Sequence, residues 1–312
     1  MTKFIKNIPV TYWQRHLRSF AIYGTPRKYS NIFRAYCEYL LGRERIVSKP
    51  AFLKVEICRF CDVNCLYCEN KKAKTLYPLD LYKQIVDQFC EYIFLVSLYD
   101  IGEPLHNPQV VDYIQYAKKK KIGTIISSSL SLMKSDSFWI DLVMSGLDTL
   151  IVAIDGISAE VYRKYRQNGK YELVMSNLKK IIELRDRYKS KMIIEWQMID
   201  FEWNRHEQSD AKRIAYELGC DRFRLIAEVS KKREAWAEQN FLRKRNCILP
   251  YILLFITSRN EVRLCYKIYS EDMRIGCLKN NSFEEIWNGS EIAEVRDRNK
   301  ISKRPGCNKC RE

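Results

Sequence analysis

The chain has 312 residues, of which 46% are hydrophobic and 29% charged, as in a globular protein with a substantial core. Its formal net charge of +16 is compatible with binding to nucleic acid or to an anionic surface. However, the basic residues are spread along the whole chain, and the densest runs, at residues 118–121 and 231–233, lie where predicted elements end. A solvated surface is therefore favoured and nucleic acid is not, while an acidic substrate or a phospholipid surface stays open.

Neither a membrane span nor a secretory signal is expected. The longest apolar run, residues 247–257, is about half of the roughly 20 residues that a spanning helix needs. Basic residues interrupt residues 1–19, which therefore do not read as a signal peptide. We expect a cytoplasmic protein, whose twelve cysteines do not form a disulfide framework and whose clustered cysteines are metal ligands or catalytic groups.

Residues 1–50 are predicted to form a basic N-terminal extension. Aromatic and apolar side chains alternate there with basic groups; they include Phe4, Ile8, Tyr12, Trp13, Phe20 and Tyr23. Two interpretations stay open for this extension. It packs as a cap against the rest of the chain, which is the favoured interpretation, or it rests peripherally on an anionic membrane.

Residues 51–230 alternate between short apolar runs typical of strands and amphipathic patterns typical of helices. The expected strands cover residues 52–57, 93–99, 123–128, 149–154, 192–199 and 222–228. The expected helices cover residues 79–90, 108–120, 135–145, 171–188 and 207–218. Strict alternation predicts parallel strands joined by crossover helices, and hence an α/β fold, an open or partial (β/α)6 barrel.

Residues 231–312 follow a different pattern and are predicted to form a small second domain held by metal. Residues 255–265 read as a hairpin, with Asn260 suited to a turn that needs positive φ. One helix is expected over residues 282–297. The remaining cysteines are concentrated in this segment: Cys247, Cys265, Cys277, Cys307 and Cys310.

Polar or cysteine-bearing segments follow the ends of the first four predicted strands. They are the cluster at residues 58–68, Gly102-Glu103-Pro104, Ser127-Ser128-Ser129 and Asp155-Gly156. In a parallel barrel the chemistry collects on loops after the carboxyl ends of the strands. These segments are therefore expected to meet at one rim.

The first of these segments, Cys58-Arg59-Phe60-Cys61-Asp62-Val63-Asn64-Cys65-Leu66-Tyr67-Cys68, has four cysteines in eleven residues. Zinc sites normally separate two ligand pairs by a dozen or more residues, whereas only three residues separate Cys61 from Cys65. Spacing this compact is more typical of an iron–sulfur cluster.

Residues 61–68 form a CxxxCxxC motif that resembles the signature of the radical S-adenosylmethionine (SAM) superfamily. The resemblance implies that Cys61, Cys65 and Cys68 hold a [4Fe–4S] cluster whose fourth iron is open to the amino and carboxylate groups of SAM. It implies that Tyr67 lies near the adenine. It further implies reductive cleavage of SAM to a 5′-deoxyadenosyl radical, with an electron from a flavodoxin- or ferredoxin-type donor. Cys58 lies outside the motif and is expected to be a packed thiol.

Other segments extend the resemblance. Tyr99-Asp100-Ile101-Gly102-Glu103-Pro104 is similar to the family's GGEP segment, which implies that Gly102 and Glu103 meet the SAM amino group, although Ile101 replaces the first glycine. By position, Ser128 and Asp155 are implied to line the ribose, where Ala153 lacks the family's serine hydroxyl. Arg166 ends a segment resembling the family's YxxxR and either pairs with the SAM carboxylate or is a surface arginine.

The C-terminal cysteines resemble the SPASM/twitch extensions of this superfamily, which carry auxiliary iron–sulfur clusters. The full pattern has seven cysteines and this segment has five, which implies one auxiliary [4Fe–4S] cluster held by Cys247, Cys265, Cys307 and Cys310. Cys277 is left over, as a structural thiol, a substitute ligand or a hydrogen-atom donor. Cys37, Cys90, Cys220 and the histidines show no ligand spacing.

Three functions follow as hypotheses. In the first, a monomeric enzyme oxidises or epimerises a sugar, aminocyclitol or other polyol-type small molecule. In the second, the enzyme modifies a ribosomally made peptide. A third hypothesis from another class, a non-catalytic zinc-bearing module that binds nucleic acid, would account for the cysteines and the charge but not for Tyr67 and Glu103 at their motif positions.

Overall fold

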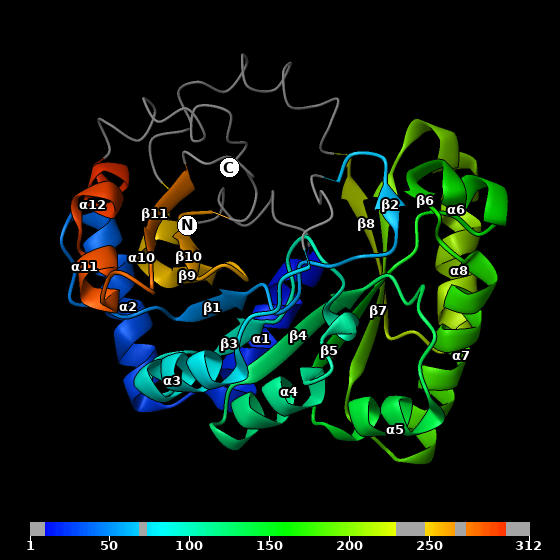
Figure 1. Ribbon diagram of the computed structural model, residues 1–312, viewed down its shortest axis with the longest axis horizontal. Coiled ribbons are helices and arrows are strands. Elements are labelled where there is room, and N and C mark those ends of the chain that lie inside the picture. The colour runs from blue at the N-terminus through cyan, green and yellow to red at the C-terminus, as the bar shows by residue number, and fades with distance from the viewer. Residues whose placement is uncertain (1–9, 69–73, 229–246, 266–272, 298–312) are drawn as a thin grey trace.

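The computed structural model describes residues 10–68, 74–228, 247–265 and 273–297 (Figure 1). They form a mixed α/β fold around a nine-stranded sheet of order β11-β10-β9-β1-β3-β4-β5-β7-β8. The strands of its parallel part are β1 (Phe52–Val55), β3 (Leu95–Ser97), β4 (Gly123–Ser128), β5 (Thr149–Ala153), β7 (Ile193–Asp200) and β8 (Arg222–Ala227). All six predicted strands are therefore present, each with ends within three residues of the prediction.

Amphipathic helices cover one face of this sheet because their apolar residues recur on one side. They are α3 (Leu79–Phe89), α4 (Val110–Lys119), α5 (Asp136–Met144), α7 (Tyr171–Arg187) and α8 (Gln208–Leu218). Helix α4, for example, buries Val110, Tyr113, Ile114 and Ala117, at the spacing of one helical face. Burying each large apolar side chain contributes about 1.5–3 kcal/mol. Short elements add α6 (Ala159–Tyr165) and two 3₁₀ turns, Pro104–His106 and Glu202–Glu207.

The N-terminal helices α1 (Val10–Tyr23) and α2 (Pro26–Leu40) pack against the other face of the sheet. The ring of Phe20 lies 6.0 Å from that of Phe52 and 4.5 Å from that of Phe94. The hydroxyl of Tyr23 donates to Asp148 Oδ1 at 2.6 Å. The favoured interpretation of these residues as a packed cap is confirmed by these contacts.

The C-terminal strands extend the same sheet beyond β1 (Figure 1). Strand β9 (Leu253–Ile256) pairs parallel with β1, while β10 (Glu261–Arg263) is antiparallel to both β9 and β11 (Arg274–Cys277). Asn260 has φ of 66°, as predicted for the hairpin turn. The division into domains at residue 231 stays a prediction.

The apolar run after Cys247 begins with a one-turn helix, α10 (Leu249–Ile252), which leads into β9. One detail of this part was predicted wrongly. The single helix expected over residues 282–297 is two helices, α11 (Phe283–Trp287) and α12 (Ser290–Arg296). The chain turns between them because the Asn288 side chain accepts a hydrogen bond from the N–H of Ile46 and donates one to its carbonyl oxygen.

The two ends of the described chain are joined at this turn. The buried guanidinium of Arg296 donates to the carbonyl oxygens of Pro250, Trp287 and Glu44. The indole N–H of Trp287 donates to the Ser48 carbonyl at 2.9 Å. Among the described residues, none of the helices has the length and hydrophobicity required to cross a bilayer.

Candidate active site

The three motif cysteines lie on the loop that follows β1. Cys65 belongs to a short strand, β2 (Asn64–Cys65), which pairs antiparallel with β6 (Arg166–Gln167). The N–H of Leu66 donates to the carbonyl oxygen of Tyr165 at 2.9 Å, and the N–H of Cys68 to that of Cys65 at 3.0 Å. The cysteine loop is therefore held against the chain that leaves α6.

The chemistry of these thiols fits an iron–sulfur cluster. Burial raises the pKa of Cys61 to about 12, and burial also raises that of Cys65, so both thiols stay protonated at neutral pH until a metal binds the sulfur. In the part of the chain that the structure describes, no three Cys, His, Asp or Glu side chains are grouped to hold one metal ion. A structural zinc site needs four ligands and the motif supplies three thiols at compact spacing, so Cys61, Cys65 and Cys68 would hold a cluster rather than one zinc.

Glu103 is buried beside the cysteine loop. Its Oε2 accepts hydrogen bonds from the N–H and the hydroxyl of Ser129, both at 2.8 Å, and its Oε1 accepts from the N–H of Leu105 at 3.1 Å. A Cβ at Gly102 would lie 2.1 Å from the carbonyl oxygen of Cys58, so only glycine permits this approach to the loop. The acceptor expected to meet the SAM amino group is thus fixed in place, although contact with SAM stays a prediction.

Asp155 and Arg166 form a buried ion pair at the same rim. Arg166 Nε donates to Asp155 Oδ2 at 2.6 Å, and the other oxygen of Asp155 accepts from the N–H of Ile199 at 2.7 Å. Burial is the largest single influence and lowers the pKa of Arg166, but Asp155, together with smaller contributions from Cys65 and two tyrosines, holds that pKa well above its ordinary value. Arg166 Nη1 also lies 3.8 Å from Cys65 Sγ. Arg166 is therefore part of the site and not a surface arginine.

An aromatic cluster borders the cysteine loop. The half-exposed ring of Tyr67 lies 6.2 Å from that of Tyr165 and 6.3 Å from that of Phe201. Phe201 in turn stacks on Trp203 at 4.4 Å. Such a surface can hold a planar ring, in agreement with the adenine contact predicted for Tyr67. Sequence reasoning missed Tyr165 and Phe201, because no motif marks them.

A cluster of buried charges lies at the carboxyl ends of β1 and β3 and was also missed. Lys54 Nζ lies 3.2 Å from Asp100 Oδ1. Glu56 Oε2 accepts from the N–H of Ser258 at 3.0 Å and lies 3.6 Å from Arg59 Nη1. Burial raises the pKa values of Glu56 and Asp100 despite their basic partners. The signal was present in the sequence as Lys54 and Glu56 alternating with apolar residues.

The cysteines of the C-terminal part are only partly described. Cys247 precedes α10 and Cys265 follows β10, whereas Cys307 and Cys310 lie outside the described residues. Cys277 is half-buried and pairs with Glu261 across β10 and β11. The four-cysteine ligand set and the role of Cys277 therefore stay predictions.

Several other candidates have local partners. The hydroxyl of Ser128 accepts from the N–H of Leu130 at 2.9 Å, so Ser129 rather than Ser128 bonds Glu103. Cys58 is buried, as a packed thiol should be. His106 Nε2 lies 3.1 Å from Asp62 Oδ1, and its ring lies 4.8 Å from that of Phe60, so this histidine fills the loop.

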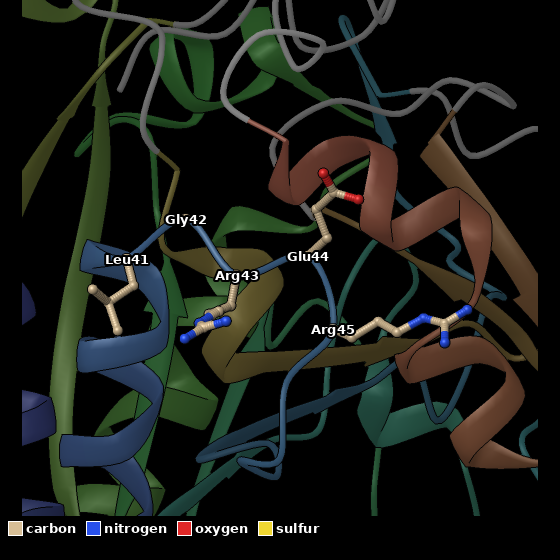
Figure 2. Close-up of a pocket in the computed structure, with 5 residues that line it drawn as sticks. All are labelled: Leu41, Gly42, Arg43, Glu44 and Arg45. Atoms are coloured by element: carbon tan, nitrogen blue, oxygen red, sulfur yellow. The ribbon is translucent and has the colours of Figure 1, made fainter.

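A cavity of about 440 Å³ lies away from the cysteine loop and is lined by Leu41, Gly42, Arg43, Glu44 and Arg45 (Figure 2). Figure 2 shows the guanidinium groups of Arg43 and Arg45 pointing in opposite directions. They do not form a joint anion clamp, and the cavity shares no residue with the candidate active site.

Two family models match the chain. The radical SAM superfamily model matches residues 55–194, and SPASM, an iron–sulfur cluster-binding domain, matches residues 247–311. The first range contains the cysteine loop, Glu103 and the Asp155–Arg166 pair, and the second contains all five C-terminal cysteines. The family resemblance and its cofactors, SAM with a [4Fe–4S] cluster and auxiliary iron–sulfur binding, are confirmed.

Known proteins give weaker likenesses. The GTP 3′,8-cyclase of Limosilactobacillus fermentum is 24% identical over 136 residues, which are 41% of this chain and 40% of that protein. The chain thus spans less than half the length of this relative. SAM-bound SuiB of Streptococcus suis superposes with a TM-score of 0.67 at 13% identity, over 92% of this chain and 79% of SuiB. BtrN with AdoMet and 2-DOIA superposes with a TM-score of 0.50 at 15% identity, over 85% of this chain and 94% of BtrN. At such identities these likenesses show the fold alone.

Proposed function

The chain belongs to the radical SAM superfamily and carries a SPASM domain, and we propose that it removes hydrogen from a C–H bond of a sugar- or aminocyclitol-type small molecule, which it epimerises or dehydrogenates. When bound, SAM and its cluster supply the 5′-deoxyadenosyl radical. The chain's own residues bind, orient and shield the reacting groups. The family match leaves no place for the alternative of a non-catalytic zinc module.

Each described site residue has a role in this proposal. Cys61, Cys65 and Cys68 would hold the cluster, and Glu103 would accept from the SAM amino group. Arg166 keeps its charge because Asp155 stabilises it, and would pair with the SAM carboxylate through its Nη groups while Nε remains on Asp155. The Tyr67 aromatic surface would carry the adenine.

The buried charges beside the cysteine loop are the observation that carries the choice of substrate. The ion pairs of Lys54 with Asp100 and of Arg59 with Glu56 lie at the strand ends where a barrel enzyme binds its substrate. Small-molecule sites use a few convergent polar groups to orient hydroxyl and amino groups. A polyhydroxylated or amine-bearing substrate would therefore find complementary partners there, and BtrN, solved with 2-DOIA, is similar over most of its length.

Modification of a ribosomal peptide is the second candidate. It is favoured by the superposition on SuiB, which has also been solved bound to the precursor peptide SuiA. A buried charged site is a poor match for the apolar side chains of an extended peptide, and for that reason we place this candidate second.

Hydrogen transfer separates the two candidates. The reconstituted enzyme is incubated without oxygen in the presence of a chemical reductant and SAM. One set of reactions contains sugars and aminocyclitols deuterated at their carbinol carbons. A parallel set contains deuterated peptides. Deuterium in 5′-deoxyadenosine from a carbinol carbon is the expected result. Deuterium that appears only from the peptides would move the assignment to the second candidate.

The electron donor and the cellular setting are part of the same proposal. A flavodoxin- or ferredoxin-type protein would reduce the cluster. Thiol ligands need a reducing compartment, which the cytoplasm provides. We expect the enzyme to work as a monomer.

A further inference from the structure

We propose that the outer face of α2 docks on an anionic phospholipid bilayer. The docking face consists of exposed apolar side chains of α2 and of the residue that follows it, and we call it the α2 patch: Tyr29, Phe33, Tyr36, Leu40 and Leu41. This surface is separate from the radical SAM site and concerns where the enzyme works, not what it does.

The α2 patch follows from helical spacing. Residues 29, 33, 36 and 40 recur at intervals of four, three and four and therefore share one face, while Lys28, Asn31 and Ala35 of the opposite face are buried. The exposed fraction is 69% for Phe33, 51% for Leu40 and 69% for Leu41. Contiguous apolar exposure of this kind marks an interaction surface. Figure 1 shows α2 at the outside of the molecule, on the far side from α5 and α8.

The aromatic residues of α1 do not supply this surface. Tyr23 is buried against Asp148, and Phe20 packs on Phe94, so both serve the cap. The membrane interpretation of the N-terminal extension therefore moves to the next helix, where Phe33 and Leu40 are more than half exposed.

The charged residues around the α2 patch indicate that its binding partner is an anionic membrane. Arg34 is exposed on α2, and Arg43 and Arg45 are exposed directly after it. Three acids lie nearby: Glu44 is exposed, Glu38 accepts from the N–H of Val47, and Glu91 pairs with Arg27 at 2.5 Å. With Arg27 the arginines number four, one more than these acids. Aromatic and aliphatic side chains bordered by arginine are the composition of helices that lie in the headgroup region of anionic membranes.

A second copy of the chain is a poorer occupant than a bilayer. In a two-fold dimer, Arg34 and Arg43 of one molecule would lie close to the same arginines of the other. These charges would repel each other, and each molecule carries a formal net charge of +16. An anionic lipid surface instead attracts these charges while the headgroup region receives Phe33, Leu40 and Leu41.

Vesicle sedimentation tests the proposal. The reconstituted full chain is mixed with vesicles of phosphatidylcholine alone, or with roughly 30% phosphatidylglycerol added, in low and high salt. Binding is expected only to the vesicles with phosphatidylglycerol, and should weaken as salt is raised. The double variant F33S/L40S should bind about tenfold more weakly, since two apolar anchors are lost. R34E/R43E should bind more weakly still at low salt.

The matched control is M144S/Y216S, which removes exposed apolar side chains on α5 and α8 at the other end of the molecule. It should bind as the unsubstituted protein does. SAM cleavage in solution should be equal for all variants, which separates loss of docking from loss of folding or of the proposed activity. Failure of the intact chain to sediment, or equal losses in patch and control variants, would overturn the proposal. So would a dimer that F33S/L40S dissociates without any vesicle binding.

Discussion

Cys65 and Arg166 lie directly opposite each other in the two-stranded pairing of β2 with β6. One segment carries a motif cysteine, and the other carries the arginine that bonds Asp155 at the end of β5. Because backbone pairing fixes this approach, the cysteine loop and the end of α6 are expected to move as a unit. Loss of the hydrogen bond between Arg166 and Asp155 should therefore also change the position of the cysteine loop.

The first prediction concerns that contact. Asp155→Asn should destabilise the fold by about 3 kcal/mol, because it leaves the buried guanidinium of Arg166 without a counter-charge. It should also weaken SAM binding. Chemical unfolding and anaerobic calorimetry measure the two effects. Asp210→Asn, at an exposed ion pair of α8, is the control and should change neither. A stable Asp155→Asn protein with normal SAM affinity would show that the pair does not organise the site.

Glu103 gives the second prediction. Glu103→Gln keeps the shape of the side chain but removes the charge that the N–H and hydroxyl of Ser129 stabilise. SAM affinity should fall about tenfold, since a charge-assisted hydrogen bond to the SAM amino group becomes a neutral one. Ser129→Ala should cause a smaller loss, and Glu217→Gln, exposed on α8, none. Unchanged SAM affinity in Glu103→Gln would remove this residue from the SAM site.

The third prediction concerns pH and Lys28. Burial lowers the pKa of Lys28 from 10.5 to about 8, while its Nζ donates to the Lys121 carbonyl at 2.8 Å. Between pH 8 and 10.5 the unfolded chain therefore binds a proton that the folded chain lacks. Relative to Lys28→Met, the free energy of unfolding of the unsubstituted protein should rise in this window, by at most about 1.4 kcal/mol per pH unit.

Below pH 8 the two proteins should show parallel pH profiles, because Lys28 is then protonated in both the folded and the unfolded state. Lys179→Met, at an exposed position of α7, is the matched control and should follow the unsubstituted protein throughout. A flat difference between the unsubstituted protein and Lys28→Met across the whole range would mean that this amine is not buried as the structure has it.

Cys277 gives the fourth prediction, which separates epimerisation from dehydrogenation. If the thiol at the end of β11 returns hydrogen to the substrate, Cys277→Ala should still form 5′-deoxyadenosine but should yield about tenfold less inverted product or none. Cys220→Ala, at a buried thiol outside the site, should keep the normal ratio. Inversion at the normal rate in Cys277→Ala would rule out this thiol as the hydrogen donor.

The strands could be predicted because each is a short, mainly apolar run of residues, which is typical of the strands of a buried parallel sheet. Residues 123–128 were predicted with both ends correct. The turn at Asn288 could not be predicted, because it depends on hydrogen bonds to Ile46, 242 residues away in sequence. Helix α2 was not assigned either, since Lys28 and Asn31 are buried while apolar residues such as Phe33 are exposed, the reverse of the usual pattern.

The candidate site was predictable where a motif names the residue and not where only the fold brings residues together. The three motif cysteines could be predicted from their spacing, and Glu103 from the segment Gly102-Glu103-Pro104. The hydrogen bonds from Ser129 to Glu103 could not be predicted, because only the local backbone decides which hydroxyl of the Ser127-Ser128-Ser129 run reaches the carboxylate. Lys54 stands out as a charged residue within an apolar strand, but nothing in the sequence identifies Asp100 as its partner.

Formation of labelled 5′-deoxyadenosine by the anaerobically reconstituted protein tests the radical SAM assignment most directly. The intact chain should hold roughly eight iron atoms in two clusters, and the variant C61A/C65A/C68A roughly four. Reduced with dithionite in the presence of SAM and a deuterated substrate, the intact chain should form 5′-deoxyadenosine containing deuterium, and the variant none. A colourless zinc protein that forms no 5′-deoxyadenosine, or equal formation by the triple variant, would contradict the assignment.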